Sequence, residues 1–468
     1  MVGYSTTAQG EALSRKWLAA CGLAADSHEK ESAVVERPSL QQAQLEIATL
    51  GPCRFRSPLK RSAQTGVGLS SFAPDDMRVL YEPRFQLGQS VPDLSFERAG
   101  ARQEIFFDPE KTRAAVVTCG GLCPGINNVI RSLVMELNHN YGVQDVLGIR
   151  FGFEGLQADK GRPPVKLTHD VVEDIHHRGG TILGTSRGHR EPRATVDFLV
   201  NQQTDILFCI GGDGTQRGAH QIAAEVARRR LPIAIVGIPK TIDNDIKYCY
   251  RTFGFYTAVA EAEKVIDCAH IEAKGVLNGV GLVKLMGREA GFIAAAATVA
   301  SGEANFTLIP EEPFALEGRQ GFLPALRRRL AAREHAVVVV AEGAGQDFLS
   351  AASDQCDIGL FLKQQIVDYF AKVSIPVGVK YFDPSYYIRS VAANAADSLL
   401  CEQLARKAVH AGMAGKTDLL IGLWHNHLIH VPLAVSTGMK KRLSTAGELW
   451  TSVLSLTGQE KWKEAPGE

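Results

Sequence analysis

Five short, mostly apolar runs constrain this chain more than any other feature, because each ends in glycine or in a polar turn. They occupy residues 114–117, 206–210, 233–238, 280–285 and 337–341. Short apolar runs without alternation are typical of strands that are buried on both faces, as in parallel sheets covered by helices. The runs therefore predict a buried, mainly parallel sheet.

Helical periodicity separates these runs. Apolar residues recur at intervals of three and four at positions 126, 130, 133 and 137, and again at positions 255, 259, 262, 266 and 269. This spacing places them on one face of a helix, where they pack in the core. Strands that alternate with helices predict an α/β protein, in which ligands bind at the carboxyl ends of the strands. All five polar turns fall at those ends.

Composition excludes several classes of function. The 468 residues include 51 Lys and Arg against 51 Asp and Glu, so no basic excess favours nucleic acid or an anionic membrane. No apolar run approaches the roughly 18 residues of a membrane span. We therefore expect neither a nucleic-acid partner nor a membrane partner.

Cysteine usage indicates the compartment. Nine cysteines in so long a chain do not form the disulfide framework of a small secreted domain, and no secretory signal precedes them. A cytoplasmic location is therefore expected. The first 25 residues contain one acidic residue, Glu11, but lack the arginine density of an organelle transit peptide, which is the less favoured alternative.

Residues 1–105 differ in their sequence pattern from the rest of the chain. They show no sustained strand or helix periodicity, and prolines interrupt them repeatedly. We interpret them as an N-terminal extension that packs on the core or serves assembly.

Two glycine-rich turns are candidate phosphate sites. Gly120-Gly121-x-x-Pro124-Gly125 follows the first run, and Gly211-Gly212-Asp213-Gly214-Thr215 follows the second. Glycines after a strand let backbone N–H groups approach a phosphate, and the helix N-terminus that comes next adds a favourable dipole. Asp213 would repel a phosphate unless a cation lay between them, so we assign it to Mg²⁺. A tight turn with a capping aspartate is the plainer alternative.

The segment Pro239-Lys240-Thr241-Ile242-Asp243-Asn244-Asp245 follows the third run. One carboxylate can accept a proton from a substrate alcohol while the other helps to hold a cation, and Lys240 can attract a phosphate. An Asx-turn at the rim of the sheet is the alternative interpretation.

Charged side chains near the other turns are candidates for anion and sugar binding. Arg187, Arg288, Lys380 and Arg389 can bind phosphate oxygens, and Glu342 can accept hydrogen bonds from sugar hydroxyls. Taken alone, each of these cations is more often a plain surface residue, and Glu342 is equally compatible with a structural role. Together the turns indicate Mg²⁺-dependent phosphoryl transfer from a polyphosphate donor to an alcohol that itself carries an anion.

The order of these motifs resembles the 6-phosphofructokinase family. Thr118-x-Gly120-Gly121-x-x-Pro124-Gly125-x-Asn127 precedes Gly211–Thr215, Pro239–Asp245, Met286-Gly287-Arg288 and Tyr386-Tyr387-Ile388-Arg389, so that the resemblance covers about residues 105–420. Lys240 and the phrase Val283-Lys284-Leu285-Met286-Gly287-Arg288 are similar to the plant and trypanosomatid branch, which is related to the pyrophosphate-dependent enzymes but includes many ATP users.

The resemblance implies a fold of two lobes, each a mainly parallel sheet flanked by helices. It places a nucleotide-binding lobe at 106–255, completed by about 390–445, a sugar-phosphate-binding lobe at 256–389 and a C-terminal tail at 446–468. It also implies a homo-oligomer, usually a homotetramer. Shorter bacterial members carry an arginine for the neighbouring subunit just before the Met-Gly-Arg strand, whereas this chain has Leu277-Asn278-Gly279-Val280 there.

The implied reaction is transfer of the γ-phosphoryl group of ATP to the 1-hydroxyl of fructose 6-phosphate in glycolysis, giving fructose 1,6-bisphosphate and ADP. Asp243 would be the base, with Thr241 beside it, and Arg187 would stabilise the phosphoryl group in transit. The nucleotide would contact Gly121, Arg187, Gly188, Gly212, Asp213, Gly214 and Thr215, with Mg²⁺ on Asp213 and Asp245. The sugar phosphate would contact Thr241, Ile242, Asp243, Met286, Gly287, Arg288, Glu342, Lys380, Tyr386, Tyr387, Ile388 and Arg389.

Two positions bear on the phosphoryl donor. In the family, glycine at position 214 accompanies ATP, because an aspartate there would repel the nucleotide's α-phosphate. Lys240 is typical of pyrophosphate users. We favour ATP. A carboxylate at position 214 would exclude the nucleotide, and this chain has glycine there, whereas Lys240 only adds attraction for phosphate. A pyrophosphate-dependent enzyme and a non-catalytic regulatory subunit are the alternatives, although a regulatory subunit would be expected to lose Asp213 or Asp243. NAD and lipid kinases share the Gly-Gly-Asp-Gly-Thr turn but lack the partner motifs.

Overall fold

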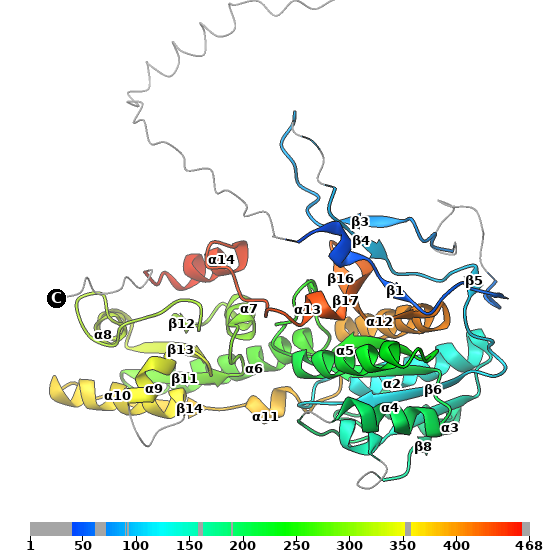
Figure 1. Cartoon of the computed structure of the whole chain (residues 1–468). Helices are drawn as coiled ribbons and strands as arrows, with labels where there is room; N and C mark the ends of the chain where they lie inside the picture. Colours follow the sequence, from blue (N-terminus) through cyan, green and yellow to red (C-terminus); the bar gives the residue numbers. More distant parts are fainter. Residues whose placement is uncertain are drawn as a thin grey trace, which may run out of the picture. The chain divides into compact units, whose positions relative to one another are not determined.

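The computed structural model describes residues 40–60, 72–88, 90, 93–157, 162–188, 191–351 and 357–460. The chain divides into two compact units, Met1–Gln41 and Gln42–Glu468. The second unit contains the two larger sheets and the helices that flank them (Figure 1). Most of the first unit, including the segment considered for a transit peptide, lies outside the described residues.

The larger of these sheets has nine strands in the order β3-β4-β17-β16-β10-β9-β6-β7-β8. Its centre is parallel and consists of β16 (Leu419–Trp424), β10 (Ala234–Pro239), β9 (Ile206–Gly211), β6 (Arg113–Thr118) and β7 (Asp145–Ile149). Every residue of β9 and β10 is buried, as expected for strands covered on both faces. Three of the five apolar runs thus form adjacent strands, with Val236 opposite Phe208 in register.

The smaller sheet is entirely parallel, in the order β12-β13-β11-β14. Its strands are β12 (Phe306–Leu308), β13 (His335–Ala341), β11 (Gly279–Leu285) and β14 (Gly378–Phe382). The remaining two apolar runs form the paired strands β11 and β13. The predicted α/β fold with mainly parallel sheets is therefore confirmed.

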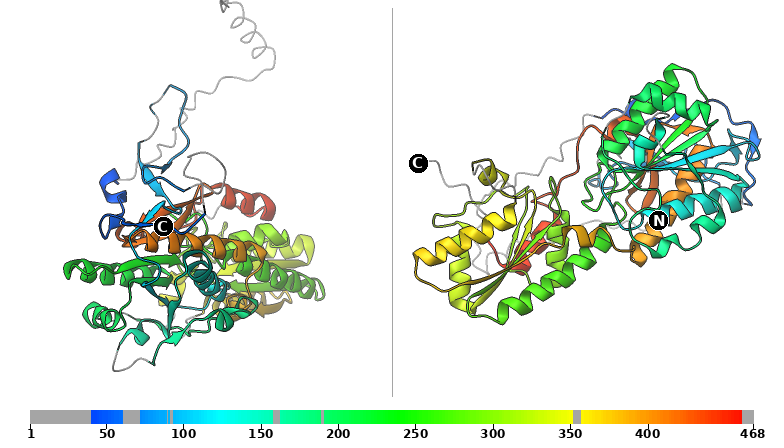
Figure 2. Two further views of the ribbon diagram at one scale, coloured as in Figure 1. Left: turned by 90° about the vertical axis from the view of Figure 1, so that its right-hand side faces the viewer. Right: turned by 90° about the horizontal axis from the view of Figure 1, so that it is seen from below.

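Helices flank both sheets (Figure 2). The large sheet packs against α5 (Asp213–Arg228) and α12 (Ala395–Met413); α4 (Pro192–Asn201) packs against α5, and α2 (Ile126–Met135) packs against α12. The small sheet packs against α6 (Phe255–Lys274), α7 (Phe292–Ser301), α8 (Phe322–Arg333) and α10 (Ile358–Lys372). Shorter helices are α3 (His169–Val172), α9 (Gln346–Ala351), α11 (Ser385–Ile388) and α13 (Leu433–Ser436). None of the described helices is long and apolar enough to cross a membrane.

The chain leaves the large sheet at the start of α6 and returns to it between α11 and α12. A buried hydrogen-bond network joins these two crossings. The Asp397 carboxylate accepts from the Thr257 amide at 2.7 Å and from the Thr257 hydroxyl at 2.6 Å, and the Asn394 amide donates to the same hydroxyl oxygen at 3.0 Å. The network fixes the two connections to each other.

The N-terminal segment contributes strands that its sequence did not indicate. β4 (Ser95–Arg98) extends the large sheet antiparallel to β17 (His427–Pro432), and β3 (Arg78–Leu80) pairs antiparallel with β4 at the edge. Two-residue strands β1 (Ala48–Thr49) and β2 (Phe55–Arg56) pair with β15 (Lys416–Thr417) and β5 (Glu104–Ile105), and β8 (Val165–Lys166) pairs with β7. Strands of two to four residues leave no readable periodicity in a sequence.

The C-terminal segment holds a helix, α14 (Glu448–Thr457), that packs against α7. Its Trp450 side chain is fully buried, whereas Leu456 on the same helix is half exposed. The burial of Trp450 anchors the end of the chain to the small-sheet side of the protein.

We predict that Trp450→Ala lowers the free energy of unfolding by about 3–5 kcal/mol, because it removes a large buried side chain and leaves a cavity. Leu456→Ala, on the exposed face, is expected to change it by less than about 0.5 kcal/mol. Urea unfolding of both variants checks this. Equal effects of the two substitutions would show that α14 is not anchored by Trp450.

Candidate functional site

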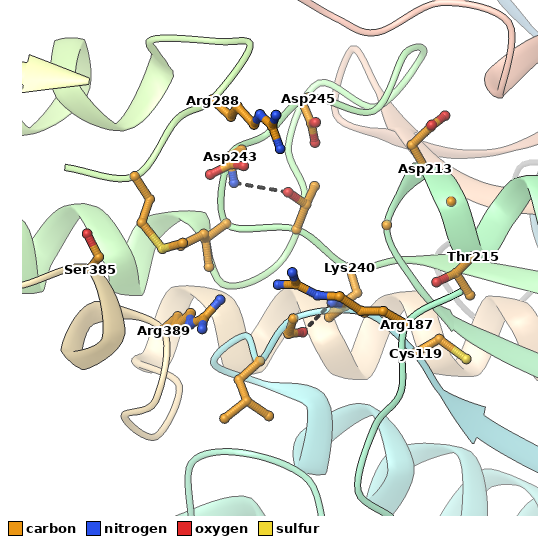
Figure 3. Close-up of a pocket in the computed structure, with 18 of the residues that line it drawn as sticks. Cys119, Arg187, Asp213, Thr215, Lys240, Asp243, Asp245, Arg288, Ser385 and Arg389 are labelled. Atoms are coloured by element: carbon orange, nitrogen blue, oxygen red, sulfur yellow. Dashed lines mark hydrogen bonds between the residues drawn. The ribbon is translucent and has the colours of Figure 1, made fainter. Parts of the chain in front are cut away.

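A cavity of about 630 Å³ lies where the carboxyl ends of strands from both sheets meet (Figure 3). The turns after β6, β9 and β10 line it from the large sheet, and those after β11, β13 and β14 line it from the small sheet. Its lining includes Gly120, Gly121, Arg187, Gly188, Gly212, Asp213, Gly214, Thr215, Lys240, Thr241, Ile242, Asp243, Asp245, Met286, Arg288, Glu342, Tyr386 and Arg389. Most of the predicted site residues therefore come together in one place.

The turn after β9 forms the start of α5, with Gly212 as the N-cap residue. The buried Gln216 side chain donates to the Gly211 carbonyl at 2.9 Å and to the Ile238 carbonyl at 3.1 Å, which fixes the turn to strand β10. A Cβ on Gly211 would lie 2.1 Å from the Thr215 hydroxyl, so only glycine fits there. Residues 212–215, at the N-terminus of α5, line the cavity, as the residues of phosphate-binding turns do.

The turn after β6 is joined to the turn that carries Arg187. The Gly120 amide donates to the Ser186 carbonyl at 3.0 Å, and the Thr185 hydroxyl donates to the Gly120 carbonyl at 2.7 Å. Gly120 has a φ of +87°, a conformation that favours glycine. These bonds hold the first glycine turn open toward the cavity, with Arg187 beside it.

Lys240 is buried at the end of β10. Its ammonium group donates to the Gly121 carbonyl, and burial lowers its pKa. The side chain therefore links the turn after β10 to the turn after β6, and it also adds positive charge to the site.

Asp243 lies in a turn that is fixed by hydrogen bonds and by a residue in the left-handed backbone conformation. Its amide donates to the Thr241 hydroxyl at 3.1 Å, and the next residue, Asn244, has a left-handed φ of 54°. The Asn244 side-chain oxygen accepts from the Thr252 amide at 3.1 Å, and its amide group donates to the Tyr250 carbonyl at 3.2 Å. Asparagine tolerates this conformation better than most residues, so the turn directs Asp243 into the cavity.

The Asp243 carboxyl has an unusual electrostatic environment. One of its oxygens, Oδ1, is buried without a hydrogen-bond partner. Burial, and then the nearby charges of Asp245 and Glu342, raise its pKa to about 7, against the opposing effect of Lys440 and Lys240. Such a carboxyl can take up a proton near neutral pH, as a general base must.

Two arginines flank the Gly121 backbone. A Cβ on Gly121 would lie 3.2 Å from Nη1 of Arg389 and 3.7 Å from Nη2 of Arg187. The Arg389 guanidinium lies over the Tyr386 ring, 4.8 Å from its centroid, and its buried Nε has no hydrogen-bond partner. Figure 3 shows Arg187 and Lys240 together, with Asp243, Asp245 and Arg288 facing them. This concentration of cations suits a ligand with several phosphate oxygens.

The small sheet contributes the turns that carry Arg288 and Glu342. The Glu342 amide donates to the Leu285 carbonyl at 2.8 Å, and the Gly343 amide donates to the Gly287 carbonyl at 3.1 Å. Burial raises the pKa of Glu342. Gly287 supports this arrangement through its backbone, with a φ of +129°, rather than by lining the cavity.

Besides Gly287, three further predicted site residues lie outside the lining: Lys380, Tyr387 and Ile388. Lys380 is exposed on β14, with Nζ 3.9 Å from the Glu272 carboxylate of α6. The Tyr387 hydroxyl donates to Glu261 at 2.7 Å, and Ile388 is fully buried in the core. Alternation along β14 turns Lys380 toward α6, and the single turn of α11 places Ser385, Tyr386 and Arg389, but not Tyr387 and Ile388, on the cavity side.

The cavity also contains charged residues that the motifs did not indicate. Lys284 is buried and forms ion pairs with Asp357 and, at 2.8 Å, with Asp383. A lone lysine within an apolar run is a signal that could have singled it out. Lys440 forms ion pairs with Glu289 at 2.8 Å and with Asp245 at 3.5 Å, yet nothing in its sequence surroundings marks it.

Two carboxylates of the cavity are available to a cation. Asp213 forms an ion pair with Arg217 at 2.7 Å, and Asp245 forms one with Lys440 at 3.5 Å. Among the described residues, no group of three or more His, Cys, Asp and Glu side chains could hold a metal. Two carboxylates in one cavity fit the needs of Mg²⁺, which takes one or two carboxylates and completes its shell with phosphate oxygens and water.

Comparison with known proteins gives consistent matches. A family model described as Phosphofructokinase matches residues 113–412. "ATP-dependent 6-phosphofructokinase" of Borreliella burgdorferi is 44% identical over 430 residues, covering 88% of this chain and 96% of the relative. "ATP-dependent 6-phosphofructokinase 7" of Arabidopsis thaliana is 45% identical, covering 78% and 77%. The "ATP-dependent 6-phosphofructokinase" of Trypanosoma brucei brucei is 41% identical, covering 90% and 88%.

A solved structure supports the fold. The pyrophosphate-dependent phosphofructokinase of Marinobacter aquaeolei superposes with a TM-score of 0.62 at 20% identity, covering 76% of this chain and 94% of the other. At this identity the likeness concerns the fold alone. It agrees with the two-sheet architecture.

We predict that Asp243→Asn stabilises the ligand-free protein by roughly 1–3 kcal/mol at about pH 8. An ordinary aspartate pKa lies near 3.8, and that of Asp243 is raised to about 7 in the fold, so ionisation of this group costs folding free energy as the pH rises between those values. The gain should shrink as the pH falls toward about 4. Urea unfolding across this range checks the sign.

The exposed Asp76→Asn is the matched control and should change stability by less than about 0.5 kcal/mol. A gain for Asp243→Asn that does not depend on pH would contradict the raised pKa.

Proposed function

The chain belongs to the phosphofructokinase family, and from this premise we propose that it is an ATP-dependent 6-phosphofructokinase. The predicted resemblance to the family and to its plant and trypanosomatid members is confirmed. The reaction transfers the γ-phosphoryl group of ATP to the 1-hydroxyl of fructose 6-phosphate, giving fructose 1,6-bisphosphate and ADP. One observation carries the proposal: two glycine turns, the Asp243 loop and the Arg288 turn line a single cavity.

Asp243 is proposed as the base that accepts the proton of the sugar's 1-hydroxyl. Its Oδ1 is buried and unpartnered, and its pKa of about 7 matches the pH at which proton transfer is most effective. Thr241 holds the amide of Asp243 and lines the cavity beside it. The group is therefore both positioned and able to take a proton.

We propose that Arg187 and Arg389 stabilise the negative charge that develops on the phosphoryl group during transfer. Both guanidinium groups lie beside Gly121 in the first glycine turn. Fixed cations and backbone N–H groups stabilise such charge without reorganising during the reaction. This placement gives Arg389 a phosphoryl-binding role as well as the predicted contact with the sugar phosphate.

Mg²⁺ is proposed to be held by Asp213 and Asp245, which line the cavity. When bound, this ion neutralises phosphate charge and helps to orient the phosphoryl donor. Arg217 and Lys440, the present ion-pair partners of these carboxylates, keep them in place within the site.

The sugar phosphate is proposed to contact Met286, Arg288 and Glu342 at the small-sheet end of the cavity. Lys380 is a weaker candidate than its motif position suggested, because its side chain is directed at Glu272. Lys284 lies closer, although its two aspartate partners make it a better support for the wall than a phosphate ligand.

ATP is the proposed donor. The relatives that cover most of this chain are named ATP-dependent. Gly214 faces open space, with no atom within 4 Å of a Cβ placed there, so a nucleotide can approach its backbone. Lys240, the residue that favoured pyrophosphate, is engaged with the Gly121 carbonyl. The homotetramer expected from the resemblance and the cytoplasmic location expected from cysteine usage remain predictions.

The experiment that tests this function measures fructose 1,6-bisphosphate formation from fructose 6-phosphate in the presence of Mg²⁺, with ATP and pyrophosphate supplied separately. We expect turnover with ATP alone. Turnover with pyrophosphate alone would contradict ATP as the donor and favour the pyrophosphate-dependent alternative. Activity with neither donor would favour the regulatory-subunit alternative.

We predict that Asp243→Ser lowers kcat by about 10³-fold, because the proton of the acceptor hydroxyl loses its base. ATP binding, which depends on other turns, should be kept. Steady-state kinetics and calorimetric ATP titration check this against Asp76→Ser, an exposed aspartate outside the cavity. A kcat close to that of the unmodified protein would remove Asp243 from the base role.

We also predict that Gly214→Asp raises the KM for ATP at least about tenfold, since a carboxylate would face the nucleotide's phosphates. Gly214→Ala is the matched control, because its Cβ meets no atom within 4 Å. If the aspartate variant used ATP as well as the alanine variant, donor choice would not depend on charge at position 214.

A further inference from the structure

A segment near the C-terminus lies across the loop that carries Asp243. Residues 439–443, here called the C-terminal strap, run between α13 and α14. Lys440 forms an antiparallel bridge with Ile246, and the Lys441 amide donates to the Asp245 carbonyl at 2.9 Å. The strap thereby adds a short strand-like pairing to the catalytic loop, residues 243–250, from a point about two hundred residues away.

The Lys441 side chain makes the strap's main contacts with this loop. Its ammonium group donates to the Asn244 side-chain oxygen at 2.9 Å, to the Cys249 carbonyl at 2.6 Å and to the Tyr250 carbonyl at 3.1 Å. Three acceptors match the three N–H donors of an ammonium group. The same group lies 5.1 Å from the ring centroid of Phe292, at the start of α7.

These contacts converge on the residue that sets the loop's conformation. Asn244 lies between Asp243 and Asp245 and has a left-handed backbone, which costs free energy for a residue other than glycine. Its side-chain oxygen accepts from both Lys441 and the Thr252 amide. Loss of the lysine would leave this turn with fewer bonds to hold its strained conformation.

The strap also reaches the small-sheet side of the cavity. Lys440 forms an ion pair with Glu289 at 2.8 Å, beside the Arg288 turn. The Leu443 amide donates to Glu311 at 2.9 Å, and the same carboxylate oxygen accepts from the Gly291 amide at 3.1 Å. The strap therefore contacts both the base-carrying loop and the turn that faces the sugar phosphate.

Lys441 itself does not line the cavity. It is separated from the proposed reactants by the loop that it holds. On the basis of the function proposed above, we propose that Lys441 is a positioning residue of the phosphoryl transfer, which fixes the Asp243–Asp245 turn at the distance and angle that proton transfer requires. The role is distinct from direct contact with the nucleotide, because the glycine turns that would hold ATP follow other strands, β6 and β9.

The test uses Lys441→Met, which keeps the length of the side chain and removes all three donors. We expect kcat to fall by about 10²-fold, as for other small misplacements of a catalytic group. The KM for ATP should change less than about threefold, since interactions made with the ground state are kept. Hydrogen exchange of the amides in residues 243–250 should become faster.

The matched control is Lys416→Met. Lys416 is also buried and forms ion pairs, with Asp75 at 3.0 Å and Glu97 at 2.8 Å, but it lies outside this cavity. Its loss should lower thermal stability while leaving the kcat of the folded protein and the exchange of residues 243–250 unchanged. A merely structural role of Lys441 would give the same pattern as this control.

Two results would overturn the inference: an unchanged kcat in Lys441→Met, or unchanged hydrogen exchange in the loop. If this variant does not fold, Lys441→Gln, which keeps two N–H donors on a shorter side chain, is measured by the same two criteria. Failure of the proposed function is distinguishable, because the unmodified protein would then lack turnover while the exchange experiment would still decide whether Lys441 holds the loop.

Discussion

The site depends on one unfavourable group, the Asp243 carboxyl, which the fold holds with a buried and unpartnered oxygen beside two other acids. Burial of such a group costs free energy, and the surroundings must determine its position to keep it there. Asn244, Thr252 and Lys441 supply the bonds that do so. A carboxyl whose pKa is raised to about 7 is then available as a base near neutral pH.

Two sheets whose strands end at a common cavity make this arrangement possible. Parallel strands deliver their turns to one edge, so residues more than two hundred positions apart, such as Gly121 and Arg389, come into contact. The large sheet supplies the glycine turns and Asp243, the proposed base, while the small sheet supplies Arg288 and Glu342. In the proposed reaction, the two sheets together hold the phosphoryl donor next to the alcohol acceptor.

The sequence was informative where structure is local. The five apolar runs correspond to β6, β9, β10, β11 and β13, because continuous burial leaves a continuous apolar pattern. The glycine turns were equally readable, since a close backbone approach excludes other residues, as at Gly211. By contrast, β3 and β4 are too short to show a period, and β17, the strand that joins β4 to the large sheet, lies more than three hundred residues away.

Contacts set by tertiary structure were not readable in the same way. Lys440 and Lys441 sit in an unremarkable stretch of sequence, and only the fold places them on the catalytic loop. Lys380 shows the opposite case: its motif position suggested the site, but strand alternation turns it toward α6. A motif identifies which turn reaches the cavity, whereas the direction of each side chain depends on packing.

The proposed role of Asp243 depends most directly on its protonation in the ligand-free protein. Infrared difference spectra between the unmodified protein and Asp243→Asn, recorded across the pH range, isolate the signal of this one carboxyl group. The structure predicts that the carboxylate band lost on substitution develops around a pKa of about 7. A band already complete at about pH 5 would mean that Asp243 has an ordinary pKa, and would contradict its assignment as a buried, unpartnered base.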